Sequence, residues 1–235
     1  MRSYSNTYIF IFSSVMVIIV AALLSGAAIT LQPYQKRNIE INKKRNILTS
    51  VNIESTAKNA EALYDQYILE SIAINSKGEI KKGVDAFNLD MKKELAKPLK
   101  ERSLPVFICS LDSSKLYIIP VYGKGLWGPI WGYVSLKNDL STIYGANFSH
   151  KGETPGLGAE IANKSFQTEF FGKNIFNDKG EFVSVRVLKN GTANPNSKYE
   201  VDGISGGTIT SRGVDAMLLD CLISYKPYFK NIKNE

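Results

Sequence analysis

A long apolar run without charged residues stands near the start of the chain, over residues 8–31. As a helix rising about 1.5 Å per residue, this run would reach about 36 Å, which is enough to cross a bilayer core of about 30 Å. A cleaved signal peptide, cut within residues 25–28, is the alternative, but only Arg2 is basic before the run and the run exceeds the ~7–15 apolar residues of a signal sequence. We therefore expect a retained single-pass transmembrane helix over 8–31, with residues 1–7 as a short N-terminus.

Weaker helical patterns follow the apolar run. Residues 32–54 are polar and basic with an imperfect apolar stripe, which predicts a juxtamembrane stalk that continues the membrane helix. Residues 55–68 show a better helical pattern, and residues 84–100 form a lysine-rich surface segment. We expect residues 55–235 to be one domain, because their number suffices for a core of their own.

Short strand-like runs occupy the middle of the chain. Four of them are rich in Val, Ile, Tyr and Phe and are separated by glycine or polar turns, which predicts an antiparallel meander over residues 104–110, 116–121, 130–136 and 142–149. A short helix or turn is predicted at 165–171, and the clean alternation at 182–188 predicts another strand. The fold class is therefore α+β, an antiparallel sheet with flanking helices.

The strongest periodic pattern lies near the C-terminus. After Ser211, apolar residues recur at the spacing of one buried helical face, and Pro227 predicts the end of this helix just before it. The helix follows a loop, residues 202–211, with three glycines and four hydroxyl residues. Backbone N–H groups at a helix N-terminus bind anions, so the loop and its Thr208 hydroxyl are candidates for a phosphate site. The alternative is that the loop only turns the chain and that Ser211 or Thr210 caps the helix.

Two other loops combine glycine with apolar side chains. Residues 123–132 hold both tryptophans and four glycines, so that an indole could stack on a flat ligand, or both could pack in the core. Residues 153–158, Glu-Thr-Pro-Gly-Leu-Gly, predict a rigid kinked loop, because Pro155 favours an extended residue before it and Gly156 suits the next turn position. This loop could clamp an aromatic ring or be an ordinary turn.

Composition excludes several classes of function. The net charge is +7, and no aromatic–basic motif accompanies it, so nucleic acid is not expected as a partner. The basic cluster at residues 36–45 is better explained by lipid head groups. A single histidine, His150, and two separated cysteines argue against a metal site or a His-dependent catalytic site. Cys109 and Cys221 are expected as buried thiols, although a disulfide stays open.

Taken together and in this order, the N-terminal anchor and four motifs resemble one family, the C subunit of the Na⁺-translocating NADH:quinone reductase. The motifs are Gly-Lys-Gly-Leu-Trp at 123–127, Gly-Glu-Thr-Pro-Gly-Leu-Gly at 152–158, Gly-Lys at 172–173 and Asp-Gly-Ile-Ser-Gly-Gly-Thr at 202–208. The G subunit of the Rnf ferredoxin:NAD⁺ complex shares the second and the last motif, whereas the first favours the sodium pump.

The resemblance implies a covalent cofactor. In the family the last motif is a flavinylation signal whose threonine, here Thr208, carries FMN through a phosphodiester made by a separate flavin transferase from FAD. Gly207 replaces the usual Ala of the motif. The FMN-contacting residues implied by the motifs are Ser205, Gly206, Gly207, Ile209 and Thr210 around the phosphate, and Glu153, Thr154, Gly156, Leu157 and Trp127 around the ring.

The resemblance also implies partners and a location. The chain would be a subunit of the membrane complex that relays single electrons from an iron–sulfur centre to another FMN subunit during NADH oxidation, quinone reduction and sodium export, with no catalysis by the isolated chain. The N-terminus would be cytoplasmic and the FMN domain periplasmic, at the inner membrane. The basic cluster at 36–45 argues for the opposite orientation by the positive-inside rule. A Rnf-type subunit and a non-redox scaffold are the alternatives.

Overall fold

The computed structural model describes residues 5–111 and 114–233 and divides the chain into two compact units, Met1–Lys43 and Lys44–Glu235. Helix α1 (Asn6–Ser50) supplies the first unit and gives its last turns to the second. The helix runs from the apolar segment through Pro33 without a break. Its apolar part is long and apolar enough to cross a membrane, and its side chains are not buried by the rest of the described chain.

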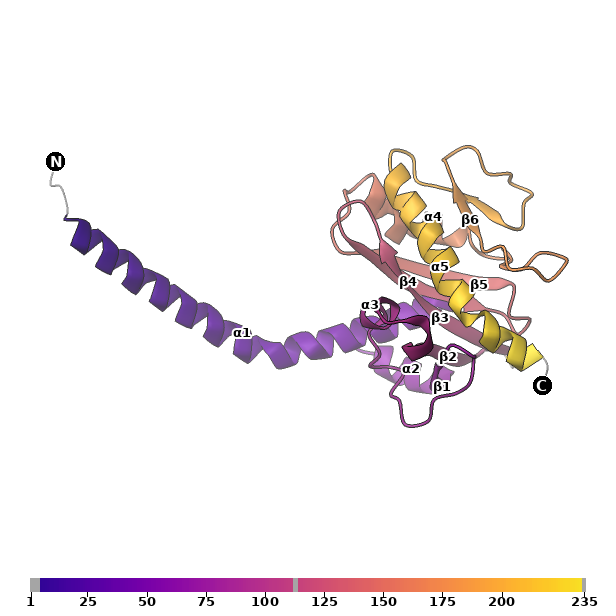
Figure 1. Ribbon diagram of the computed structural model, residues 1–235, viewed down its shortest axis with the longest axis horizontal. Helices are drawn as coiled ribbons and strands as arrows, with labels where there is room; N and C mark the ends of the chain where they lie inside the picture. Colours follow the sequence, from indigo (N-terminus) through magenta and orange to yellow (C-terminus); the bar gives the residue numbers. More distant parts are fainter. Residues whose placement is uncertain (1–4, 112–113, 234–235) are drawn as a thin grey trace. The chain divides into compact units, whose positions relative to one another are not determined.

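The second unit is built on a five-stranded antiparallel sheet with strands in sequence order (Figure 1). The strands are β1 (Ile68–Ile74), β2 (Leu104–Leu111), β3 (Ser114–Lys124), β4 (Pro129–Leu136) and β5 (Ile143–His150). The predicted four-strand meander is thus confirmed as β2 to β5. Strand β1 was not predicted: the helix expected over 55–68 is only α2 (Ala60–Tyr67), and the chain becomes extended at Ile68.

The helix α5 (Thr208–Lys233) crosses one face of this sheet (Figure 1) and packs mainly on β3. Its predicted apolar face is confirmed, since Val214, Leu218 and Leu222 are fully buried. The opposite face of the sheet is covered by α2 and the end of α1, where Ile47 and Leu48 are fully buried. One sheet therefore separates two cores, and α5 lies in the larger of them.

The predicted end of the last helix at Pro227 is wrong, because α5 continues to Lys233. A proline inside a helix leaves the carbonyl four residues earlier without its backbone donor. That residue is Ile223, whose side chain is half-exposed, so water can reach this turn. Burial of Tyr228 and Phe229 beyond the proline stabilises the continued helix.

The strand predicted at 182–188 is also mostly wrong. Only β6 (Arg186–Leu188) is a strand, and it pairs in parallel with β7 (Glu200–Asp202), which was not predicted. Ser184 has a φ of 60°, a conformation that interrupts an extended run. The short helix predicted at 165–171 is α4 (Lys164–Thr168), preceded by the 3₁₀ turn η2 (Gly158–Ala162).

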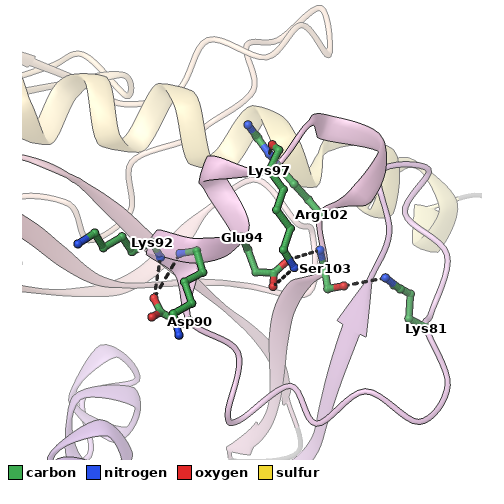
Figure 2. A network of polar contacts seen from close by, with 8 residues as sticks. Lys81, Asp90, Lys92, Glu94, Lys97, Arg102 and Ser103 are labelled. Carbon is green, nitrogen blue, oxygen red and sulfur yellow. Dashed lines mark hydrogen bonds and ion pairs between the residues drawn. The ribbon is translucent and has the colours of Figure 1, made fainter.

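The long connection between β1 and β2 contains α3 (Met91–Ala96) and η1 (Leu99–Glu101) and is held by a polar network (Figure 2). The buried Glu94 carboxylate accepts hydrogen bonds from the Lys97 Nζ at 2.6 Å and the Ser103 backbone N–H at 2.8 Å. Lys81 Nζ in turn donates to the Ser103 hydroxyl at 2.7 Å. Burial raises the pKa of the Glu94 carboxyl, but these donors outweigh it and the pKa lies below its usual value.

Candidate functional site

The structure brings the three glycine-containing loops together at the start of α5. A side chain at Gly213 would collide with the Lys124 carbonyl, so α5 and the 123–132 loop touch through backbone. A Cβ at Gly206 would lie 2.6 Å from Leu157 Cδ2, which places the tip of the 153–158 loop on the 202–211 loop. Three segments that are far apart in sequence therefore lie together. No single motif predicted this proximity, which was implied only by the resemblance of all the motifs to one family.

The buried carboxylate of Glu153 joins these segments. Its Oε1 accepts the Trp127 backbone N–H at 2.9 Å, and its Oε2 accepts the Thr210 hydroxyl at 2.5 Å. Burial raises the pKa of this carboxyl, but the Thr210 hydroxyl and the backbone N–H groups of Trp127, Leu126 and Gly128 outweigh burial and hold the pKa below its usual value. The carboxylate is thus fully engaged by the protein, and its role in this site is to position both loops.

Close packing around Glu153 explains two glycines. A Cβ at Gly125 would lie 2.5 Å from Glu153 Oε1, and a Cβ at Gly158 would lie 2.7 Å from Oε2. Any larger residue would displace the carboxylate from its donors. These glycines make room for a buried charge, which spacing in the sequence did not reveal.

Thr208 is the first residue of α5, so the helix begins inside the segment that was predicted to be a loop up to Ser211. The helix begins here because the Gly207 carbonyl accepts the Ser211 backbone N–H at 2.9 Å. The Thr208 residue is exposed, and its hydroxyl has no hydrogen-bond partner among the described residues. It is available for chemistry with an incoming group.

The neighbouring hydroxyls are occupied by the protein. Ser211 Oγ donates to the Gly207 carbonyl at 2.9 Å and accepts the Ile204 backbone N–H at 2.8 Å, so it fastens the loop onto the helix. Thr210 is committed to Glu153 and is buried. Both residues lie inside the first turn of α5, so neither is its N-cap and the alternative that Ser211 or Thr210 caps the helix is wrong. Their hydroxyls fasten the loop to the helix and to Glu153 instead.

The acidic residue that opens the last motif has a structural role. Asp202 Oδ1 accepts the backbone N–H groups of Thr192 at 3.0 Å and Ala193 at 2.9 Å. This holds the surface loop after β6 against β7. Asp202 thereby fixes the strand that delivers the 202–211 loop to α5.

Exposed apolar side chains surround the start of α5. Trp127 is 69% exposed and Ile209 is 56% exposed, with Leu126 and Leu157 also exposed. The alternative that Trp127 packs in the core is therefore wrong. These loops are held by many hydrogen bonds, yet they expose large apolar side chains to solvent. Such exposed apolar groups are typical of a surface that binds a ligand or a partner.

The 153–158 loop is rigid for local reasons. The Thr154 carbonyl accepts the backbone N–H groups of Leu157 and Ala159, both at 3.1 Å. Gly156 has a φ of +74°, as the predicted turn requires, and its N–H donates to Glu160 Oε1 at 2.8 Å. The exposed Leu157 is thus presented on a fixed support.

A cavity of about 220 Å³ lies beside Thr208, which is one of its lining residues. Its lining includes residues that sequence reasoning did not select, because they come from β6 and the following loop or from the second turn of α5: Arg186, Lys189, Asn190, Arg212 and Asp215. Arg212 stands four residues after Thr208, which is one helical turn, so helical spacing could have found it. Asp215 follows Thr208 by two helical turns on the same helix. Arg186, Lys189 and Asn190 belong to β6 and the loop after it, which pairs in parallel with β7 and contacts α5.

The two cysteines lie away from this site and are free and buried, as expected. Cys221 exchanges hydrogen bonds with the Tyr122 backbone, and burial raises its pKa to about 11. Burial likewise raises the pKa of Cys109 to about 11. Both thiols are therefore protonated and unreactive at neutral pH.

Residues 125–223 match the family described as FMN-binding domain. This segment contains the 153–158 and 202–211 loops and all but the first two residues of the 123–132 loop, so the domain is of the FMN-binding class. The chain is also similar over most of its length to curated proteins named as the C subunit of Na(+)-translocating NADH-quinone reductase. The relative from Pseudomonas aeruginosa is 30% identical over 91% of this chain and 90% of its own length, and the relative from Vibrio vulnificus is 31% identical over 84% and 83%.

Solved structures agree with this similarity. A crystal structure of the C subunit of Na(+)-translocating NADH-quinone reductase from Parabacteroides distasonis is 46% identical, with a TM-score of 0.79 over 85% of this chain and 96% of that one. The structure of NqrC from Shewanella oneidensis is 25% identical, with a TM-score of 0.72 over 86% and 100%. The chain belongs to the family of C subunits of the Na⁺-translocating NADH-quinone reductase, and with α1 it is a single-pass membrane-anchored subunit.

Proposed function

We propose that this chain is a covalent flavoprotein, with FMN joined through a phosphodiester to Thr208. The observation that carries the proposal is the exposed and unpartnered Thr208 hydroxyl at the point where the three loops meet. Within the complex the chain relays single electrons from an iron–sulfur centre to another FMN subunit, during NADH oxidation, quinone reduction and sodium export. When bound, FMN supplies the redox chemistry, while the protein supplies attachment, orientation and the surrounding charge.

The residues present fit such a group. Thr208 lines a cavity whose walls also hold Lys189 and Arg212, and exposed apolar side chains, led by Trp127 and Leu157, stand near the same end of α5. A phosphate ester of a flat aromatic ring system needs both surroundings. Gly206, with a φ of +72°, and the buried Gly207 allow the backbone to approach closely at the attachment point.

Attachment is proposed to use a flavin transferase and FAD. The Thr208 hydroxyl oxygen bonds to the phosphorus on the FMN side of the FAD pyrophosphate, the pyrophosphate P–O bond breaks, and AMP leaves. The hydroxyl proton passes to a base of the transferase or to water. Gly207 stands where the motif usually has Ala, and a Cβ at this position would lie 3.0 Å from the Ile204 Cβ, so glycine relieves the loop rather than blocking it.

The other motif residues are proposed to shape and flank the site. Ser205, Gly206, Gly207 and Ile209 form the rim around the attachment point. Thr154, Gly156, Leu157 and Trp127 flank the ring. Glu153 and Thr210 act indirectly, because both are buried and bonded to each other, and so they position the two sides of the site.

The domain organisation and location are proposed as follows. Residues 1–7 are cytoplasmic, 8–31 cross the inner membrane, 32–54 form the stalk, and 55–235 form the FMN domain on the periplasmic side, with the stalk residues from Lys44 onwards packed into the same compact unit as the domain. Of the basic cluster at 36–45, Lys36 and Arg37 contact lipid head groups, whereas Lys44 pairs with Glu61 and Arg45 donates to the Ser55 carbonyl. Labelling a cysteine introduced at exposed Lys198 with a membrane-impermeant thiol reagent in intact spheroplasts tests the orientation, and labelling only after lysis contradicts it.

The deciding experiment is intact mass, with in-gel flavin fluorescence after denaturation, on the full chain expressed with a flavin transferase. We expect one added FMN in the parent chain and none in Thr208→Ala. Thr208→Ser keeps a hydroxyl and is the matched control that tests whether the alcohol suffices. Covalent flavin retained in Thr208→Ala rejects the attachment site, and normal assembly of a complex with an unmodified parent chain supports the scaffold alternative.

A further inference from the structure

The cavity beside Thr208 contains two positive charges without a protein counter-charge. It lies between β6, the loop that follows it, the Gly203–Ile204 segment and the first turns of α5, which contacts β6. Figure 1 shows β6 beside the same helix. The cavity is therefore placed to receive whatever is joined to the Thr208 hydroxyl.

One arginine of the cavity is already neutralised. The guanidinium of Arg186 donates from Nε and Nη2 to the two carboxylate oxygens of Asp215, at 2.9 and 3.1 Å. Asp215 Oδ1 also accepts the Val187 backbone N–H at 2.8 Å. The Asp215 carboxylate is thus occupied by β6, and this pairing fixes one wall of the cavity against α5.

Lys189 and Arg212 are different. Neither side chain has an ion-pair or hydrogen-bond partner in the described part of the chain, yet both line the cavity. Arg212 follows Thr208 by one helical turn, and Lys189 directly follows β6 on the opposite wall. Asn190 completes this wall, with its Nδ2 donating to the Gly203 carbonyl at 3.1 Å.

We infer that Lys189 and Arg212 bind the non-bridging oxygens of the phosphodiester at Thr208 and so fix the flavin tether. This inference rests on the proposed function. A phosphodiester carries one negative charge, and a guanidinium with a second cation on the opposite wall neutralises it with directed hydrogen bonds. The phosphate is held in the cavity beside Thr208, and the ring extends from it to the exposed apolar residues near the start of α5.

These residues are therefore positioning residues for the flavin. Without them the ester bond at Thr208 persists, but the chain beyond it can rotate. The orientation of the ring then depends only on contacts with side chains such as Trp127 and Leu157. Loss of the two cations is expected to loosen the flavin without releasing it.

The test uses the full chain in detergent with Lys189→Gln, Arg212→Gln and the double variant. Lys198→Gln, at an exposed lysine that does not line the cavity, is the matched control. The unmodified chains are titrated with inorganic phosphate and followed by backbone amide NMR. The same chains are then flavinylated, and the yield and the fluorescence anisotropy of the attached flavin are measured.

We expect inorganic phosphate to shift the amides at 189 and 208–212 in the parent chain and in Lys198→Gln, with loss of this response in the double variant. We also expect lower anisotropy of the attached flavin in the double variant. Anisotropy in the double variant equal to that of the parent chain overturns the inference. This holds even if the yield of flavinylation falls, because a lower yield alone indicates that the transferase recognises the two cations. If the parent chain responds to phosphate but takes up no covalent flavin, the proposed function is overturned and not the phosphate site. If the parent chain shows neither the phosphate response nor covalent flavin, the proposed function and the inference are both overturned.

Discussion

The Thr210 hydroxyl donates to the Glu153 carboxylate at 2.5 Å, across 57 positions of sequence. The same carboxylate accepts the Trp127 backbone N–H, so one buried charge connects the start of α5 with two loops. Each loop carries exposed apolar residues, and their relative positions are fixed through this shared contact. The geometry of the site therefore depends on an acidic residue that does not need to touch a ligand.

Replacing Glu153 by Gln tests this role. The amide keeps the shape of the carboxyl but removes its charge, so the hydrogen bonds from the Thr210 hydroxyl and the Trp127 backbone N–H lose a charged acceptor. We expect a loss of about 1–3 kcal/mol in the free energy of unfolding. Denaturant unfolding of the full chain in detergent measures it, with Glu169→Gln at an exposed site as control. Equal stability of the two variants contradicts the role of Glu153 as a structural link.

The pH dependence of stability follows from the same contact. The pKa of Glu153 in the folded chain lies below its usual value of 4.5, so the folded state favours the ionised form. The stabilisation is therefore complete above the usual pKa and is lost as pH falls through the lowered value. Unfolding midpoints measured from about pH 7 to about pH 3 should fall more steeply in the parent chain than in Glu153→Gln. The pKa of Glu94 is also lowered, so this residue contributes equally to the pH dependence of the parent chain and of Glu153→Gln. If the unfolding midpoints of the two proteins fall equally with pH, Glu153 is not the source of the pH dependence.

Gly213 gives a prediction in which two effects oppose each other. Inside a helix, Gly→Ala normally stabilises by about 0.5–1 kcal/mol. Here the added Cβ would collide with the backbone carbonyl of Lys124, which cannot move without shifting the end of β3. We expect Gly213→Ala to destabilise the fold by about 1–3 kcal/mol, as overpacking does. Ala216→Gly on the exposed side of α5 calibrates the helix propensity alone, and a raised unfolding midpoint for Gly213→Ala refutes the close approach.

The sequence predicted those elements whose pattern is set by their own residues. The meander and the buried face of α5 were found because alternation and helical spacing reflect burial on one side. The pair β6–β7 was missed because strands of three residues depend on partners that are distant in sequence. The part of α5 beyond Pro227 was missed because the burial of Tyr228 and Phe229 outweighs the local effect of proline.

The candidate site shows the same division. Thr208 could be found because the motif is local and the helix follows it directly. Lys189 could not, because it comes near Thr208 only through the parallel pairing of β6 and β7. The positioning role of Glu153 was also hidden, since its partners at 127 and 210 lie in other motifs.

Trp127 provides a prediction that separates stability from flavin environment. Its side chain is 69% exposed, so Trp127→Ala should change the free energy of unfolding by less than about 0.5 kcal/mol. If the indole flanks the attached ring, as proposed, the same variant should alter the visible absorption band and raise the fluorescence yield of the flavin, because stacking on an indole perturbs both. Leu219→Ala, at a 38% exposed position of α5 outside the site, is the control. Unchanged flavin spectra in Trp127→Ala, with normal flavinylation, would show that the ring lies elsewhere and leave Leu126, Leu157 and Ile209 as the surface to test next.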